Sequence, residues 1–131
     1  MKPELIHPLV LAYLGDGVFE VYVREYLVKD CQLAKPDLLQ KKATFYVSAR
    51  AQAGFMHKAI ENQWLSEEEI SVYKRGRNAK SVSPAKNQSV TDYRRATGFE
   101  ALLGYLYLKK EWQRILDLVK MGLDSLNDEN E

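Results

Sequence analysis

The pattern of apolar and polar positions predicts helices along nearly the whole chain. From Pro8 to Val28 the polar residues Asp16, Glu20 and Arg24 recur every four positions in an otherwise apolar run. A period of four matches one stripe of a helix, and proline suits the first turn of a helix. Because the run is apolar on nearly all its other sides, it predicts a central helix buried on most of its faces.

Two glycines interrupt this apolar run. Gly15 and Gly17 flank Asp16, and each weakens a helix by about 1 kcal/mol relative to alanine. Their presence indicates a close approach by another helix or by a second subunit.

Local signals predict the helices that follow. Pro36 and Asp37 open a helical stretch towards Ile60, with a kink or a division near Val47-Ser48. Ser66, followed three residues later by an acid, has the spacing of a capping box, and its helix is expected to run to about residue 77.

The last part of the chain reads as a loop and two helices. Residues 76–90 have the composition of an exposed loop, after which Thr91 or Asp92 is expected to cap a helix. A final amphipathic helix is expected near Lys109, followed by an acidic, frayed tail at 127–131. The expected inner face of this final helix consists of Trp112, Ile115, Leu116, Val119 and Leu123. We therefore expect an all-α fold, a compact bundle of five to seven helices in a single domain, 1–131, with its core at about 8–126.

Composition limits the classes of function. The chain has 131 residues, 46% of them hydrophobic and 28% charged, which is typical of one soluble globular domain. No apolar run reaches the length of about 18 residues that spans a membrane, and the first residues lack a signal-peptide pattern, so we expect a cytoplasmic protein with no membrane partner. The lone Cys31 cannot form an internal disulfide and is expected to be a small packing residue, and His7 and His57 are interpreted as structural.

Charge is unevenly distributed although the net charge is only +1. Between Leu38 and Ile60 the four charged residues are all basic, and between Ser71 and Arg95 seven basic residues face one acid, Asp92. A nearly neutral protein with such windows can still carry a basic face.

Asp16 and Glu100 are the candidate catalytic acids. Each lies on an apolar helical face lined with small residues, where an unpaired carboxylate is unfavourable. Two such acids on separate helices can hold Mg²⁺ while leaving coordination positions to water and phosphate. The alternative is that each acid pairs with an arginine, such as Arg24 or Arg94.

The candidate RNA-binding segment runs from Lys74 to Lys86. Its cations alternate with small and polar residues, which lets the backbone approach a phosphate chain. The candidate contact residues are Lys74, Arg75, Arg77, Asn78, Lys80 and Lys86. A second patch holds Lys41, Lys42 and Arg50. The alternative for the segment from Lys74 to Lys86 is a solvated charge run, and the alternative for the second patch is merely the polar face of its helix.

Several separated motifs resemble those of a known family. Leu14-Gly15-Asp16 and Phe99-Glu100-Ala101-Leu102-Leu103-Gly104 are similar to the two signature segments of the ribonuclease III catalytic domain. Together with Tyr46-Val47-Ser48-Ala49 and the segment from Lys74 to Ser81, they resemble the compact branch of this family, Mini-ribonuclease III, over about residues 9–119.

This resemblance implies a homodimeric, magnesium-dependent endoribonuclease that cuts double-stranded RNA, with Mn²⁺ as a possible substitute metal. Asp16 and Glu100 match the metal-binding catalytic acids, and the basic segment matches an RNA-contacting loop. The implied products carry 5′-phosphate and 3′-hydroxyl ends. The implied substrate is a precursor of large-subunit ribosomal RNA, with a ribosomal protein assisting and no separate double-stranded-RNA-binding domain.

Two positions depart from the broad family pattern. Acids expected four residues before Asp16 and three before Glu100 are replaced by Ala12 and Thr97, which leaves two carboxylates instead of four. Two other functions remain open on the residues alone: a catalytically silent RNA-binding dimer in ribosome assembly, and a protein-interaction bundle without an RNA role.

Overall fold

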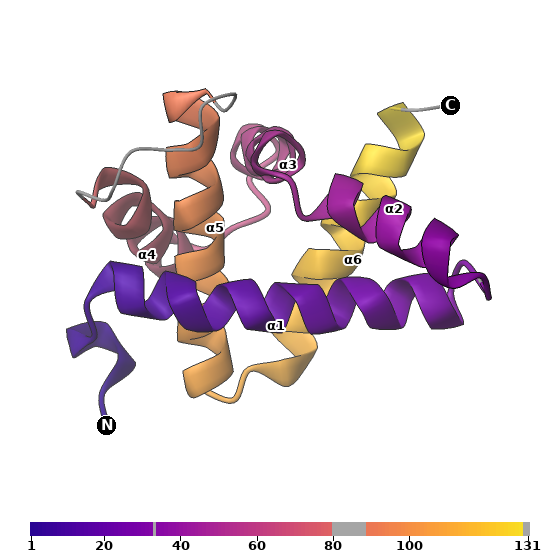
Figure 1. Cartoon of the computed structure of the whole chain (residues 1–131). Helices are drawn as coiled ribbons and strands as arrows, with labels where there is room; N and C mark the ends of the chain where they lie inside the picture. Colours follow the sequence, from indigo (N-terminus) through magenta and orange to yellow (C-terminus); the bar gives the residue numbers. More distant parts are fainter. Residues whose placement is uncertain (33, 80–88, 130–131) are drawn as a thin grey trace.

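The computed structural model describes residues 1–32, 34–79 and 89–129 (Figure 1). This part of the chain is helical and contains no strand, as the sequence predicts. After the short 3-10 turn η1 (Pro3–Leu5) it forms α1 (Pro8–Lys29), α2 (Pro36–Tyr46), α3 (Ala49–Glu61), α4 (Glu67–Asn78), α5 (Val90–Leu108) and α6 (Trp112–Glu129). None of the described helices is long and apolar enough to cross a membrane.

The crossing of α1 and α5 organises the bundle, and Figure 1 shows α1 running across α5. Two glycines make the crossing close: a Cβ atom on Gly15 would overlap the carbonyl oxygen of Glu100, and one on Gly104 would overlap that of Leu11. The close approach predicted at Gly15 is therefore confirmed, and the partner is another helix. Gly17, by contrast, has open space where its Cβ would be.

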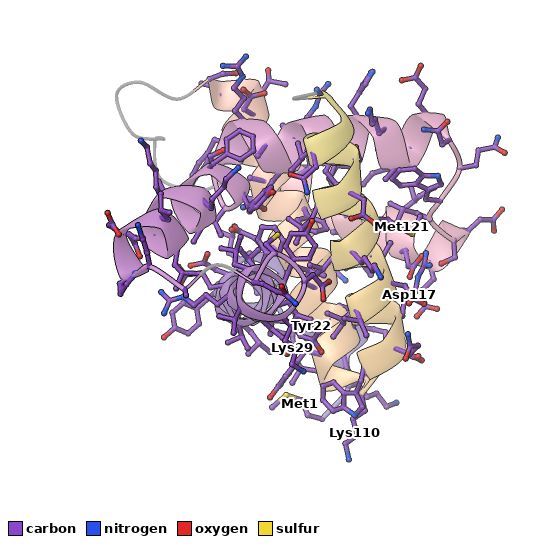
Figure 2. The ribbon with its side chains drawn as sticks, turned by 90° about the vertical axis from the view of Figure 1, so that its right-hand side faces the viewer. Met1, Tyr22, Lys29, Lys110, Asp117 and Met121 are labelled. Atoms are coloured by element: carbon purple, nitrogen blue, oxygen red, sulfur yellow. The ribbon has the colours of Figure 1, made fainter. Side chains whose placement is uncertain are left out.

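The core lies where α1, α3 and α5 meet. The ring of Phe99 on α5 packs edge-on against Phe19 of α1 and Phe55 of α3, with centroid distances of 5.2 and 5.0 Å. The second half of α1 also lies beside α6, and in Figure 2 Tyr22 and Lys29 occupy this side of α1. Residues lining the small cavity between the two helices include Tyr22, Lys29, Leu116 and Leu123.

Most helix ends follow from local sequence signals. The helical stretch divides at the predicted place, because α2 ends at Tyr46 and the Ser48 side chain caps α3 by accepting from Ala51 N at 3.1 Å. The capping box at Ser66 and Glu69 is present in both directions.

Four details differ from the expectations. Ser89, rather than Thr91 or Asp92, caps α5, since its hydroxyl accepts from Asp92 N at 3.2 Å. On α6, Trp112 and Leu116 are exposed, while Leu118 and Leu126 are buried. Cys31 is exposed. Helix α1 was expected to be buried on most of its faces, but its buried residues form one side and the opposite side is open to solvent.

The predicted frayed tail is also wrong at its start. Helix α6 continues to Glu129, and the Asn127 amide lies between two tyrosines: it donates to Tyr26 Oη at 2.6 Å and accepts from the Tyr46 hydroxyl. These two bonds tie the end of α6 to α1 and α2. Residues 130–131 lie outside the described part.

Candidate metal centre and RNA-binding surface

Asp16 and Glu100 come together at the α1–α5 crossing. Gly15 lets the backbone of α1 approach the carbonyl of Glu100, so the next residue of α1, Asp16, lies beside the Glu100 side chain. The two carboxyl groups are close enough for Asp16 to raise the pKa of Glu100. The convergence of two acids from separate helices, which spacing alone left open, is therefore present in the structure.

The surroundings of Glu100 strongly perturb the pKa of its carboxyl group. Burial raises its pKa to about 8, and the neighbouring charge of Asp16 acts in the same direction. A hydrogen bond from Gln52 Nε2 to Glu100 Oε2, 3.2 Å long, opposes this rise. The site thus favours either a proton on Glu100 or a cation shared between the two acids.

No described arginine or lysine pairs with either acid. Arg24 instead lies 3.6 Å from Glu20 on the same helix, and Arg94 is exposed with no ion pair to a described residue. The arginine alternative is therefore not observed in this part of the chain. Asp16 itself is exposed, because it lies beside the open side of α1, so the desolvated acid is Glu100.

The two positions that depart from the family pattern supply no further ligand. Ala12 is buried, and the Thr97 hydroxyl donates to Tyr93 O one turn earlier at 2.9 Å. Among the described residues no group of three or more acidic, histidine or cysteine side chains could hold a metal. A pair of carboxylates still suits Mg²⁺, which commonly keeps several waters and binds one or two carboxylates together with substrate phosphate.

The predicted RNA-binding residues have different surroundings. Lys74 and Asn78 are exposed at the end of α4. Arg77 lies over the ring of Tyr73, 5.7 Å from its centroid, and donates to Asn78 Oδ1 at 3.1 Å. These three residues present polar groups to solvent in one turn of helix. Lys80 and Lys86 lie outside the described residues.

Arg75 is engaged elsewhere. Its guanidinium donates to the carbonyl oxygens of Glu4 and Ile6, each at 3.3 Å, and so holds the N-terminal segment against α4. RNA contact by Arg75 stays a prediction, and it would compete with these two bonds.

The two basic windows of the sequence meet at one surface. Arg50 from the first window and Arg95 from the second line the same open cavity of about 750 Å³, together with His57 and Asp92. His57 is 2.9 Å from Glu61, whereas neither arginine forms an ion pair with a described residue. Arg95 lies about one and a half turns before Glu100 on α5. Helix α5 therefore contributes both to the cavity and to the acid pair.

Gln52 and Arg95 were not identified from the sequence. Arg95 had a detectable signal, since it closes a window rich in basic residues. Gln52 had a weaker one, a single amide among the small residues of Ala49-Arg50-Ala51-Gln52-Ala53, and periodicity does not distinguish it from a solvated side chain.

Comparisons with known proteins show what the whole chain is similar to. The Ribonuclease III domain matches residues 9–111. A Mini-ribonuclease 3 of Enterococcus faecalis is 48% identical over 126 residues, covering 96% of this chain and 95% of that protein. A Mini-ribonuclease 3 of Brevibacillus brevis is 48% identical over 128 residues, covering 98% and 93%. A crystal structure of a Fusobacterium nucleatum protein superposes with a TM-score of 0.79 at 28% identity, covering 92% of this chain and 94% of that one.

The all-helical fold and the matched domain define a ribonuclease III domain, and the chain belongs to the ribonuclease III family. Within that family it is similar, over nearly its whole length, to the Mini-ribonuclease 3 branch, so the resemblance seen in the sequence motifs is confirmed. The chain is accordingly an endoribonuclease. Members of the family act on double-stranded RNA, generally depend on a divalent metal ion and typically dimerise.

Proposed function

We propose that this chain hydrolyses double-stranded RNA at the Asp16–Glu100 pair. The observation that carries the proposal is that two carboxylates meet and that no described lysine or arginine pairs with either of them. The two acids would hold Mg²⁺, or Mn²⁺ in its place, and the bound ion would supply an activated water and charge stabilisation at the scissile phosphate. The expected products carry a 5′-phosphate and a 3′-hydroxyl.

The role of the protein in this reaction is to hold the two acids side by side. Because Asp16 is exposed, it is open to a phosphate approaching from solvent, while Glu100 is anchored from behind by Gln52. A partly buried, hydrogen-bonded carboxylate beside an accessible one gives the site one fixed ligand and one that faces the substrate.

RNA binding would rest on basic side chains of α3, α4 and α5. Arg50 and Arg95 in the open cavity, and Lys74 and Arg77 at the end of α4, are placed to displace counterions from a phosphate backbone. Side chains cannot reach into the deep major groove of A-form RNA, so recognition would be largely by shape and phosphate position.

We also propose a homodimer that uses the open side of α1. Four large apolar side chains return to this side along the helix, and the uncovered Gly17 lies among them. They are Val10, Tyr13, Val21 and Val28, which we call the α1 stripe, and Tyr13 is 85% exposed. A twofold dimer would carry one acid pair for each RNA strand.

A precursor of large-subunit ribosomal RNA is the proposed natural substrate, with a ribosomal protein assisting cleavage. The support is the similarity of the motif set to the compact branch of the family. Incubation of the precursor transcript with the purified enzyme, with and without ribosomal proteins, would test both points: cutting at one site supports the proposal, and random or absent cutting opposes it.

The central experiment is a cleavage assay on long double-stranded RNA with and without Mg²⁺. We expect Asp16→Asn and Glu100→Gln to lose at least about 100-fold in rate while still binding RNA, because each removes one of two ligands. Glu20→Gln, which changes an acid one turn along α1, is the control and should cut normally. Wild-type rates in both site variants would refute the assignment.

A further inference from the structure

The side chain of Gln52 is the most unusual buried polar group in the described part of the chain. It lies in the first turns of α3 and is only 3% exposed. Its Nε2 donates to two acceptors, Val47 O at 3.0 Å and Glu100 Oε2 at 3.2 Å. Both amide protons are therefore used, and both acceptors come from other parts of the fold: the junction between α2 and α3, and the acid pair.

The other end of the same amide has no partner. Gln52 Oε1 is fully buried and accepts no hydrogen bond from any described residue. An unpaired buried acceptor is unfavourable, and an apolar side chain of the same length would avoid it. The amide is therefore better explained by what its two N–H groups do than by its contribution to packing.

We infer that Gln52 is a positioning residue that holds Glu100 in the orientation needed to share a divalent cation with Asp16. By fixing Oε2, the amide selects one rotamer of the Glu100 side chain and keeps the carboxylate directed towards Asp16. The bond to Val47 O fixes the amide in turn, so that the carboxylate is held by a rigid helix junction. This inference rests on the proposed metal site.

A neutral amide suits this position better than a charged partner. An arginine or lysine would neutralise Glu100 and compete with the metal, and a third acid would add repulsion to a pair of like charges. An amide N–H supports the ionised carboxylate without supplying a charge, which is the kind of outer interaction that orients metal ligands.

The first test is a titration of the RNA-free protein with Mn²⁺, in which electron paramagnetic resonance measures the concentration of the free ion. We expect Gln52→Met, which keeps the length but removes both donors, to bind Mn²⁺ at least about tenfold more weakly than wild type. The Mg²⁺ concentration for half-maximal cleavage should rise by the same factor. Most of the rate should return at saturating Mg²⁺, with an unchanged KM for RNA.

Two control variants separate positioning from general destabilisation. Ser66→Ala removes the cap of α4 and so destabilises a helix end without touching Gln52 or Glu100. Gln113→Met removes an exposed amide that donates to Asp117 at 2.8 Å. Both should keep the wild-type affinity for Mn²⁺, even where Ser66→Ala lowers the melting temperature.

The outcomes distinguish this inference from the proposed function. If Glu100→Gln binds Mn²⁺ weakly and a folded Gln52→Met binds it like wild type, the inference is wrong and the metal site stands. If Glu100→Gln itself binds like wild type, the metal site falls, and the inference with it.

A second measurement needs no variant that must fold. The side-chain amide of Gln52 in ¹⁵N-labelled wild-type protein should shift on Mg²⁺ addition and saturate together with the metal site, while the amide of Gln113 stays unchanged. A Gln52 signal that does not respond to Mg²⁺ would overturn the inference.

Discussion

At the scale of single residues, the site depends on the contrast between two neighbouring acids. Asp16 is accessible, whereas Glu100 is desolvated and held by Gln52. A cation that binds both acids would replace the proton that burial favours on Glu100. Metal binding should therefore release a proton and strengthen as the pH rises towards 8.

The raised pKa of Glu100 predicts a pH-dependent stability in the absence of metal. Burial raises this pKa from 4.5 to about 8, so the folded protein binds more protons than the unfolded chain between these values. The contribution of this proton to the free energy of unfolding is complete below about pH 4.5 and is lost as the pH rises through 8. Between these values the free energy of unfolding falls by up to about 1.4 kcal/mol per pH unit.

Urea unfolding in EDTA at pH 5, 6.5 and 8 measures this slope. Glu100→Gln should remove it, and added Mg²⁺ should restore stability to the wild type at pH 8. Parallel pH profiles for the wild type and the variant would contradict the expected titration of Glu100.

The two neighbouring arginines of α4 should differ in what they do. Arg75 holds the carbonyls of Glu4 and Ile6, so Arg75→Ala should loosen η1 and lower the melting temperature. Arg77→Ala should instead weaken RNA binding and reduce the slope of log affinity against log salt by about 1, since one phosphate contact is lost. Calorimetry and salt-dependent binding to double-stranded RNA measure both effects. A larger loss of RNA affinity in Arg75→Ala would reverse the assignment.

At the scale of secondary-structure elements, the close crossing of α1 and α5 creates the site. The glycine on each helix removes the side chain that would keep the backbones apart, and the acids follow from that contact. Any change that separates these helices should therefore affect stability and catalysis together.

Gly15→Ala tests this coupling. Its Cβ would overlap the carbonyl oxygen of Glu100, so we expect a loss of about 3 kcal/mol or more in the free energy of unfolding, with a matching loss of Mn²⁺ affinity. Gly54→Ala in α3 is the matched control, because nothing lies within 4 Å of its Cβ. It should be neutral or stabilising by up to about 1 kcal/mol. Equal effects of the two substitutions on urea unfolding would show that backbone proximity is not the cause.

The elements were more predictable from the sequence than their contacts. The prolines and capping serines gave correct helix starts at Pro8, Pro36 and Ser66 because these signals act within one turn. The cap of α5 was misplaced because Ser89, Thr91 and Asp92 can all cap, and only the packed helix selects among them. The pairing of Asp16 with Glu100 and the role of Gln52 depend on which helices cross, which periodicity does not specify.

At the scale of the whole molecule, the exposed features suit the proposed RNA substrate and the proposed dimer. The net charge is only +1, yet Arg50 and Arg95 share one cavity although they are far apart in sequence. Tyr13 of the α1 stripe lies less than one turn from Asp16, which places the proposed dimer interface next to the site. A dimer would thus set the distance between two acid pairs along an RNA duplex.

The dimer proposal predicts a specific effect of charge on the α1 stripe. Val21 is 62% exposed in the stripe, and Val90 is 53% exposed at the start of α5. Val21→Asp would bury a carboxylate in the interface, which is strongly unfavourable, whereas Val90→Asp places the same group at a helix N-terminus in solvent. Light scattering should give wild type and Val90→Asp twice the chain mass of 15.1 kDa, and Val21→Asp the mass of one chain.

Val21→Asp should also cut double-stranded RNA more slowly at low protein concentration and recover as dimer forms again. A wild-type protein that is monomeric at micromolar concentration, or a Val21→Asp variant that remains dimeric, would remove the α1 stripe from the interface.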